Sequence, residues 1–324
     1  MAKAAIPVDL YNPGQVFACL GFLEAADMLL GDAEGGFEWS DEEDVKFVLS
    51  APGERNPFEV VLEFLAEAEP RRWGPAGYAD PPPKKKTAGR EDDSEGGDQD
   101  GTENETACSS IELAETFPAE KGDRMALPIR LGGGNRPIVE LGHWADGSSR
   151  RSFKLYAGNR SACKIARAML QGVRKKPSKN QKQKGEPGDL KAKGIAQLWE
   201  EERTNLVDRP FYILTPMGGS FNFDPRGAWT AIDAGYSPNE HKHTVEASPV
   251  VEFLAAWGLE HARPEEFDTR QVRYAVWGML LPPILARAAL TGAVPSLPMR
   301  HFRFELDMSG KNKVVAFAEL ETQP

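Results

Sequence analysis

A low-complexity stretch at residues 77–108 divides this chain and limits where a folded core can form. It carries PPPKKK followed by EDDSEGGDQDGTENE, and after Tyr78 it has no aromatic and almost no apolar side chain. Such a segment cannot bury enough surface to offset the conformational entropy that ordering costs. We therefore predict a disordered acidic and proline-rich linker at 77–108, between an N-terminal α+β unit at 1–76 and two later regions at 109–206 and 207–324.

The N-terminal unit contains the clearest helix signal. Asn12 followed by Pro13 is typical of an N-cap and a first helical position, and Gly31 is typical of a helix end. Apolar residues surround nearly the whole predicted helix and spare mainly Glu24 and Asp27, so it should be buried on most faces. Short strands at 37–39 and 45–49 and an amphipathic helix at 57–68 complete an αββα-like pattern.

The later regions mix short strands with helices. The patterns predict strands at 126–131, 138–143, 152–156, 211–215 and 271–277, and helices at 161–173, 189–203, 249–261 and 283–290. Residues 175–188, rich in Lys, Gln, Gly and Pro, form a predicted mobile lysine loop. Strands at 300–307 and 313–320 flank Ser309-Gly310 and predict a C-terminal β-hairpin. Because no regular βαβ alternation occurs, we expect an α+β fold of mixed short sheets and helices.

The composition excludes several classes of protein. With 40% hydrophobic and 27% charged residues, the chain suits a soluble globular protein. It has no signal-peptide-like start and no run of roughly 20 apolar residues, so we expect no membrane association. Cys19, Cys108 and Cys163 lie far apart in the sequence, which argues against a disulfide framework or a zinc site and favours a reducing, cytoplasmic compartment.

Charge is distributed very unevenly. Residues 150–193 hold 14 Lys and Arg against 2 acidic residues, a net +12, whereas the whole chain has −10, so the remainder sums to −22. On the predicted helix at 161–173, Arg160, Lys164, Arg167, Gln171 and Arg174 oppose the apolar stripe along roughly 21 Å. A solvated face that pairs with acidic neighbours is the alternative. The candidate nucleic-acid-binding residues are Arg150, Arg151, Lys154, Arg160, Lys164, Arg167, Arg174, Lys175, Lys176, Lys179, Lys182 and Lys184.

A glycine run between two predicted strands is a second candidate. Its backbone N–H groups could approach a phosphate or a base edge, with nearby arginines adding charge. It lacks the G-K-[ST] ending of a P-loop, so nucleotide hydrolysis is not supported. A plain glycine hairpin is the favoured alternative. The residues of this possible duplex-reading loop are Arg130, Gly132, Gly133, Gly134, Asn135 and Arg136.

No pattern points to a catalytic centre. His241-Lys242-His243 has no further His or Cys to complete a metal set, and no G-x-S-x-G or H-E-x-x-H motif occurs. We therefore predict no enzyme activity, no metal and no cofactor. Aperiodic aromatics at 220–241 suit base stacking, a subunit contact or a small core under a long loop.

Two stretches resemble a known family. IPVDLYNPGQVFACLGFLEAADMLLGDAEGGFEW at 6–39 and FNFDPRGAWTAIDAGYSPNEH at 221–241 are similar to the short large-subunit proteins of type I-G CRISPR systems, formerly called type I-U. The resemblance implies a non-enzymatic subunit of a Cascade-type antiviral surveillance complex. Its implied partners are the backbone subunits that carry CRISPR RNA, target double-stranded DNA beside the protospacer-adjacent motif, and the helicase-nuclease. The predicted C-terminal hairpin departs from the helical bundle of better-known large subunits.

In such a complex base pairing reads the sequence, so the protein needs phosphate contacts and a short duplex-reading element. We expect the basic segment to hold DNA phosphates and Arg136 or Asn135 to read a base edge. Charge reversal at Lys164, Arg167 and Arg174 should then weaken DNA binding. Two alternatives remain: a metal-free CRISPR RNA-processing endoribonuclease that uses His143 or the His241/His243 pair as base, and a scaffold without nucleic-acid contact.

Overall fold

The computed structural model describes residues 1–41, 43–80, 108, 111–115, 125–145, 153–156, 160–184, 186–217, 219–228, 245–294, 296–309 and 312–321. Most of the predicted linker therefore lies outside the described residues. Its two ends belong to the folded protein: Asp80 accepts two hydrogen bonds of 2.9 Å from the Arg72 guanidinium, and Cys108 is buried. The folded part thus extends further at both ends of the predicted linker than the composition indicated.

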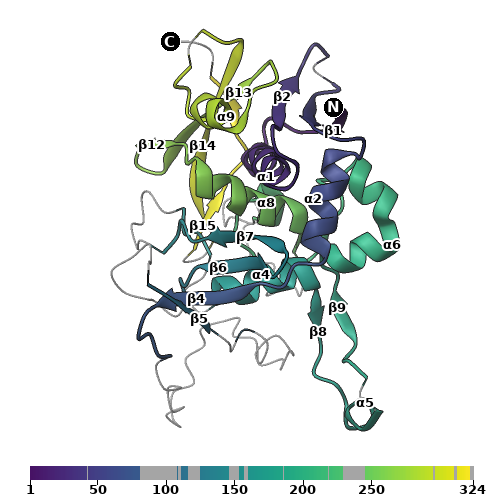
Figure 1. The fold of residues 1–324 in the computed structure, drawn as a ribbon. Helices are drawn as coiled ribbons and strands as arrows, with labels where there is room; N and C mark the ends of the chain where they lie inside the picture. Colours follow the sequence, from purple (N-terminus) through teal and green to yellow (C-terminus); the bar gives the residue numbers. More distant parts are fainter. Residues whose placement is uncertain are drawn as a thin grey trace.

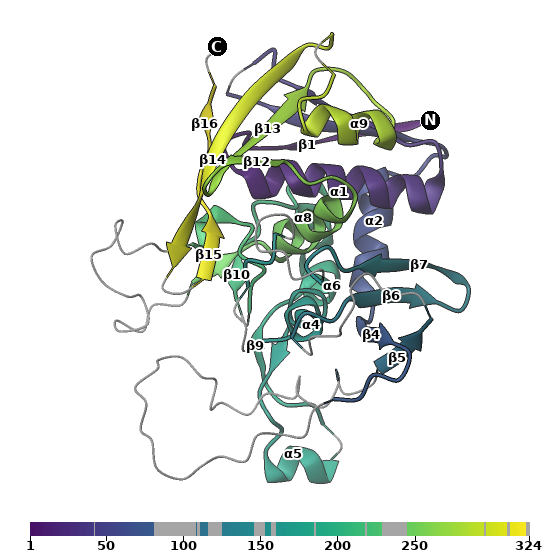
Figure 2. The same cartoon turned by 90° about the vertical axis from the view of Figure 1, so that its left-hand side faces the viewer.

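Two apolar helices cross at the centre of the protein (Figures 1 and 2). They are α1 (Pro13–Leu30) and α8 (Pro249–His261). A Cβ atom at Gly21 would lie 2.1 Å from the Leu254 carbonyl oxygen, and one at Gly258 would lie 2.2 Å from the Phe17 carbonyl oxygen. The two backbones are therefore too close for any side chain at these positions, which fixes the crossing.

The start of α1 confirms the sequence prediction. The Asn12 side chain accepts a hydrogen bond of 3.2 Å from the Gln15 N–H, and Pro13 is the first helical residue. Glu24, one of the two charged positions on this apolar helix, is buried, and the Arg287 guanidinium of α9 (Pro283–Leu290) donates two hydrogen bonds of 2.7 Å to its carboxylate. Although α1 is long and apolar enough to cross a bilayer, 78% of it is buried inside the structure.

A three-stranded antiparallel sheet in the order β1-β3-β2 packs against α1. The strands are β1 (Ala2–Pro7), β2 (Glu34–Glu38) and β3 (Lys46–Ala51), and α2 (Pro57–Ala66) follows them. The two strands predicted here are confirmed with shifted ends, whereas β1 carries no alternating pattern and was not predicted. Across the core, the Trp277 indole N–H donates to the Gly35 carbonyl oxygen at 2.8 Å.

A second antiparallel sheet forms from the C-terminal part of the chain. Its strands are β12 (Glu265–Asp268), β13 (Gln271–Trp277), β14 (Met299–Ser309), β15 (Asn312–Val315) and β16 (Glu319–Leu320). Ser309 pairs with Asn312, which confirms the predicted C-terminal hairpin. The Tyr274 hydroxyl donates to the Leu10 carbonyl oxygen at 2.5 Å, so N-terminal and C-terminal segments share one core with α1 and α8.

The middle of the chain forms a third sheet in the order β5-β4-β6-β7, and two helices. The elements are β4 (Arg71–Pro75), β5 (Ile111–Ala114), β6 (Ile129–Gly133), β7 (Arg136–Leu141), α4 (Ala162–Gln171) and α6 (Ile195–Asp208). β4 and β5 run parallel, although they come before and after the predicted linker. The mixture of short sheets and helices confirms the α+β class.

Three of the helices and strands predicted between residues 152 and 215 are wrong in whole or in part. Residues 153–156 form no strand. Phe153 has a φ of 46°, which is incompatible with an extended strand, and the backbone of the next three residues is irregular. The predicted helix at 189–203 begins only at Ile195, because Leu190–Ala192 (β9) pairs with another strand. The predicted strand at 211–215 shortens to Thr215–Pro216 (β10), which pairs with Glu246–Ala247 (β11).

Candidate nucleic-acid interface

A narrow basic ribbon projects from the body of the protein. Its strands β8 (Val173–Arg174) and β9 are antiparallel, and the short helix α5 (Lys179–Lys184) lies at its far end (Figures 1 and 2). The Lys175 N–H donates to the Asp189 carbonyl oxygen at 2.9 Å, which continues the pairing beyond the strands. The predicted lysine loop is therefore a ribbon with a helical tip rather than an irregular loop. We call residues 173–192 the basic ribbon.

Several cationic side chains of the basic ribbon have no carboxylate partner. Within the described part of the chain, none of the following forms an ion pair with a carboxylate: Arg174, Lys175, Lys176, Lys179 and Lys184. Asp189 instead accepts a hydrogen bond of 3.0 Å from the Gln181 amide. Lys175, Lys176, Lys179 and Lys184 are exposed. The ribbon thus presents several free ammonium groups on a thin projection.

Three of the predicted contact residues cannot be placed. Arg150, Arg151 and the side chain of Lys182 lie outside the described residues. Lys154 is half-buried, with its ammonium 4.5 Å from the centre of the Tyr156 ring. Its charge therefore belongs to the folded body and not to the basic ribbon.

The basic row predicted along one helix is shorter than expected. Ser161 caps α4, and Gly172 ends it with a φ of 72°, so Arg160 and Arg174 lie outside the helix. The predicted apolar stripe is confirmed, since Ile165, Met169 and their neighbours are buried. Lys164 and Arg167 are only half-buried, and the Gln171 amide donates to the Ala68 carbonyl oxygen at 2.7 Å. The helix therefore uses part of this face for packing.

The glycine run forms the tight turn between β6 and β7. Gly132, Gly133 and Gly134 have φ values of 77°, 105° and 67°, and a Cβ atom at Gly132 would lie 1.8 Å from the Pro137 carbonyl oxygen. These positions require glycine for the turn itself. The carbonyl of Gly132 also accepts a hydrogen bond of 2.5 Å from the Arg71 guanidinium. The structure thus explains the glycine run without a ligand.

The arginines of this hairpin are occupied by carboxylates. Arg130 donates to Glu112 at 2.9 Å and to Glu140, and its guanidinium lies 5.2 Å from the centre of the Trp73 ring. Arg136 forms an ion pair with Glu67. Asn135 is exposed at the turn. The two arginines of the predicted duplex-reading loop are therefore already neutralised by carboxylates, whereas the Asn135 side chain lies exposed at the turn.

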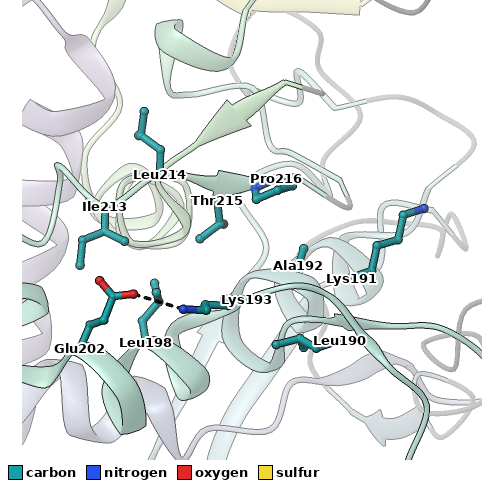
Figure 3. A pocket seen from close by; sticks show the side chains of 10 residues that line it. All are labelled: Leu190, Lys191, Ala192, Lys193, Leu198, Glu202, Ile213, Leu214, Thr215 and Pro216. Atoms are coloured by element: carbon teal, nitrogen blue, oxygen red, sulfur yellow. Dashed lines mark hydrogen bonds and ion pairs between the residues drawn. The ribbon is translucent and has the colours of Figure 1, made fainter. Parts of the chain in front are cut away.

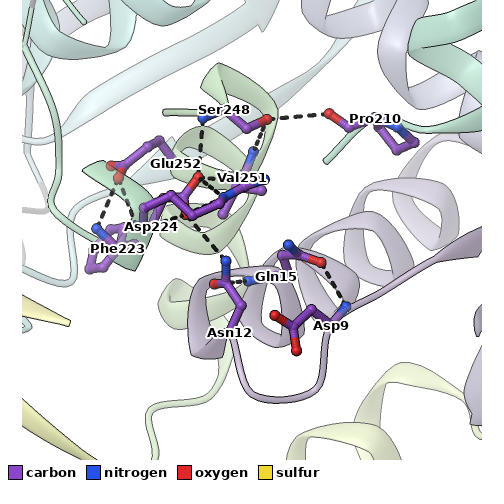
Figure 4. Close-up of polar contacts among 10 residues, drawn as sticks. Asp9, Asn12, Gln15, Pro210, Phe223, Asp224, Ser248, Val251 and Glu252 are labelled. Carbon is purple, nitrogen blue, oxygen red and sulfur yellow. Dashed lines mark hydrogen bonds and ion pairs between the residues drawn. The ribbon is translucent and has the colours of Figure 1, made fainter. Parts of the chain in front are cut away.

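Residues 219–228, which carry the FNFDPRG sequence, are held by a buried carboxylate of α8 (Figure 4). Glu252 accepts hydrogen bonds from the N–H groups of Phe221 at 2.8 Å, Phe223 at 3.0 Å and Asp224 at 2.8 Å. Complete burial raises the pKa of Glu252 to about 7, against the opposing effect of these N–H donors. The loop is therefore fixed to the helix by one side chain.

Asp224 joins this loop to the ends of two helices (Figure 4). Its carboxylate accepts hydrogen bonds from the Asn12 amide at 3.2 Å and from the Ser248 N–H at 3.1 Å, and these residues cap α1 and α8. The Arg226 guanidinium donates to it at 2.6 Å. The buried charge is thus compensated within the network.

The aromatic residues of this loop are core residues. Phe221 and Phe223 are fully buried, and the Phe221 ring stacks on Trp144 with centroids 5.3 Å apart. Neither ring can stack on a base, so that alternative is wrong for 220–228; the two rings also belong to the main hydrophobic core and not to a small separate core under a loop. Residues 229–241 lie outside the described residues.

An open pocket of about 420 Å³ lies at the base of the basic ribbon (Figure 3). Leu198 and Ile213 line it from the body of the protein, while β9 contributes Lys191, and Lys193, directly after β9, also lines it. The Lys193 ammonium lies 2.7 Å from Glu201 and 3.2 Å from Glu202. The pocket therefore has a mixed lining of apolar and charged side chains, and the charge of Lys193 is paired with carboxylates.

One of the three histidines considered as a catalytic base can be placed in the structure. The His143 ring is fully buried against Trp144, with its Nδ1 3.5 Å from the Glu260 carboxylate, so it cannot reach an RNA substrate. His241 and His243 lie outside the described residues. Within the described ranges, no three His, Cys, Asp or Glu side chains are grouped as metal ligands. Comparison of the chain with protein-family models, with curated proteins and with solved structures found no match.

Proposed function

We propose that this protein is a non-catalytic subunit of a type I-G CRISPR surveillance complex. In this proposal the basic ribbon holds target DNA near the protospacer-adjacent motif and stabilises the R-loop, while other surfaces dock the backbone subunits and the helicase-nuclease. The resemblance of residues 6–39 and 221–241 to that family suggests the complex. The observation that carries the nucleic-acid contact is the set of exposed lysines on the basic ribbon without a carboxylate partner in the described part of the chain: Lys175, Lys176, Lys179 and Lys184.

The shape and charge of the ribbon suit a phosphate backbone. A two-stranded ribbon is narrow enough to enter or follow a DNA groove. Lys175, Lys176 and Lys179 lie close together in sequence on the projecting part, where each can neutralise a phosphate and release counterions. Phosphate contacts carry no sequence information, which is what a guide-directed complex requires, since base pairing selects the target.

The rest of the chain predicts weak binding by the isolated protein. Outside residues 150–193 the net charge is −22, so long-range repulsion opposes the local attraction of the ribbon for DNA. Assembly with other DNA-binding subunits would raise the effective concentration of DNA at the ribbon. We therefore expect measurable DNA affinity at low salt and much stronger retention in the assembled complex.

Affinity purification of the tagged protein from its own cells tests the assembly. Mass spectrometry of the co-purified proteins and sequencing of the retained RNA should identify backbone subunits and repeat-derived guide RNA. Recovery of the protein alone, or with partners but without such RNA, would contradict the proposed complex.

Charge reversal tests the ribbon directly. The variant K175E/K176E/K179E changes exposed side chains only, and it should weaken binding to duplex DNA and reduce the slope of log K against log salt by about 2 to 3, since each phosphate contact contributes about 0.9. The control K3E/K46E/R55E makes the same charge change at ion-paired positions elsewhere. An unchanged salt slope in the folded ribbon variant would overturn the contact.

The two alternatives give different results. An RNA-processing enzyme would cleave repeat RNA at one site, and H241A or H243A would abolish the cleavage. A scaffold whose ribbon contacts acidic proteins would lose those partners in K175E/K176E/K179E while its nucleic-acid binding stayed the same.

A further inference from the structure

Two cysteines far apart in the sequence meet inside the protein. Cys108 and Cys163 are separated by 55 positions, yet their sulfur atoms lie 2.7 Å apart. Cys163 belongs to the first turn of α4 and is 1% exposed, and Cys108 precedes β5 and is 6% exposed. The Cys163 sulfur also lies 3.5 Å from the Pro70 carbonyl oxygen, directly before β4. The pair therefore lies where α4 packs against the β4–β5 part of the third sheet.

The separation of the sulfurs is close to that of a covalent bond. A disulfide has sulfurs about 2.05 Å apart, so the two atoms need to approach by only about 0.7 Å. Two cysteines with Cα atoms more than about 7 Å apart, or with diverging Cβ atoms, could form a disulfide only if the backbone moved. The fold thus brings both side chains into bonding position before any oxidation.

The surroundings give the two thiols different chemistry. The Cys163 thiol donates a hydrogen bond to the Cys108 sulfur, which lowers the pKa of Cys108, and the positive charges of Arg167, Arg72 and Lys164 act in the same direction. The same hydrogen bond, together with burial, raises the pKa of Cys163. Cys108 is therefore the thiol that reacts as a thiolate, and Cys163 is its neighbour in position to react next.

We propose that Cys108 and Cys163 form a redox-sensitive modification site that closes to an intramolecular disulfide on exposure to a hydroperoxide. The Cys108 thiolate attacks one oxygen of hydrogen peroxide and breaks the O–O bond. The departing hydroxide takes up the proton that the Cys108 thiol released on ionisation, which gives a Cys108 sulfenic acid and one water. The Cys163 sulfur then attacks the Cys108 sulfur, and the sulfenic hydroxyl leaves with the Cys163 proton as a second water. Two thiols and one hydrogen peroxide thus give one disulfide and two waters.

A redox-sensitive cysteine pair is compatible with the prediction that this chain has no structural disulfide framework. The spacing of the three cysteines excludes a structural framework but shows nothing about which of them meet in space. In a reducing compartment a disulfide between two such cysteines would be transient, as redox-sensing disulfides are. The site is independent of the proposed DNA contact, because it requires only the two sulfurs and an oxidant.

The third cysteine serves as an internal control. Cys19 lies within α1, is completely buried and is a free thiol, and burial raises its pKa well above the usual value. It should stay reduced under conditions that oxidise the other pair. Any loss of the Cys19 thiol at the same rate would indicate general unfolding and not a specific site.

Peptide mass mapping of the full-length protein tests the proposal. After brief exposure to hydrogen peroxide and digestion without reductant, we expect a peptide pair joined through Cys108 and Cys163, lighter by two hydrogens and separated by dithiothreitol. Recovery of Cys108 as a sulfinic acid or a free thiol, with no linked peptide, would overturn the proposal. A linkage between two copies of the chain would overturn it equally.

A kinetic measurement tests the separate roles of the two thiols. In C163A the hydrogen bond to Cys108 is gone, so alkylation of Cys108 by iodoacetamide at pH 7 should slow by about tenfold for each unit by which its pKa rises. C19A is the matched control and should leave the rate at Cys108 unchanged. An unchanged rate in folded C163A would refute the assigned roles, and the mapping of the wild-type protein needs no variant.

Discussion

Replacement of Glu252 by Gln tests how the FNFDPRG loop is held. Glu252 is completely buried, and its pKa is raised from 4.5 to about 7, mainly because burial penalises the charged form. The difference is about 2.5 pKa units, and each unit corresponds to about 1.4 kcal/mol of differential interaction between the two protonation states. Glu252 should therefore change the stability of the protein by about 3 kcal/mol over its titration.

The sign follows from which state binds the proton more tightly. The folded protein holds the Glu252 proton up to a pH of about 7, whereas the unfolded chain releases it near 4.5. Its contribution is fully present below pH 4.5 and is lost as the pH rises through 7. Because Gln does not titrate, the free energy of unfolding of the wild type relative to E252Q should fall by about 3 kcal/mol between pH 4.5 and 8.

Urea unfolding followed by tryptophan fluorescence at several pH values gives the required free energies. The difference between wild type and variant removes the titration of every other group. The control E200Q, at an exposed position of α6, should give a difference that does not vary with pH. A constant difference for E252Q would refute the reasoning, and a difference that grew with pH would mean that the three N–H donors outweigh burial and hold the carboxylate charged.

Three further substitutions test the core. G258A places a Cβ atom 2.2 Å from the Phe17 carbonyl oxygen and should lower the free energy of urea unfolding by about 3 kcal/mol or prevent folding, as judged by circular dichroism. R287M leaves the buried Glu24 carboxylate without its partner and should cost about 2 kcal/mol in the same assay, whereas E24Q/R287M should recover part of the loss. N12A removes the cap of α1 and should lower Tm, with a cost of about 1 kcal/mol.

Elements with a complete local signal were predicted well. The cap and length of α1, the apolar stripe of α4 and the hairpin of β14 and β15 each depend on residues close together in sequence. β1 and β4 were missed because their stability comes from partners elsewhere in the chain. β4, for example, pairs with β5 and β6, both of which lie beyond the predicted linker.

Charged residues were predicted less well, because the sequence gives a side chain's type and not its partner. The sequence marks Glu24 as a charged interruption of an apolar helix, but it does not show that Arg287, 263 positions later, pairs with it in the core. Arg130 and Arg136 appeared ready to bind a phosphate, yet Glu112, Glu140 and Glu67 occupy them. Spacing rules describe one helix or strand at a time and cannot show such long-range pairs.

The presence or absence of a carboxylate partner distinguishes the exposed lysines of the basic ribbon from the arginines of the folded body. Within the described body of the protein, arginines such as Arg72, Arg130 and Arg287 each meet a carboxylate, so they contribute to the fold. On the described part of the ribbon, Lys175, Lys176, Lys179 and Lys184 have no such partner, and their mutual repulsion costs energy in the isolated chain. A ligand with several negative charges would remove that repulsion. The cations that the fold leaves unused are therefore a stronger indication of a nucleic-acid contact than the total charge of the segment.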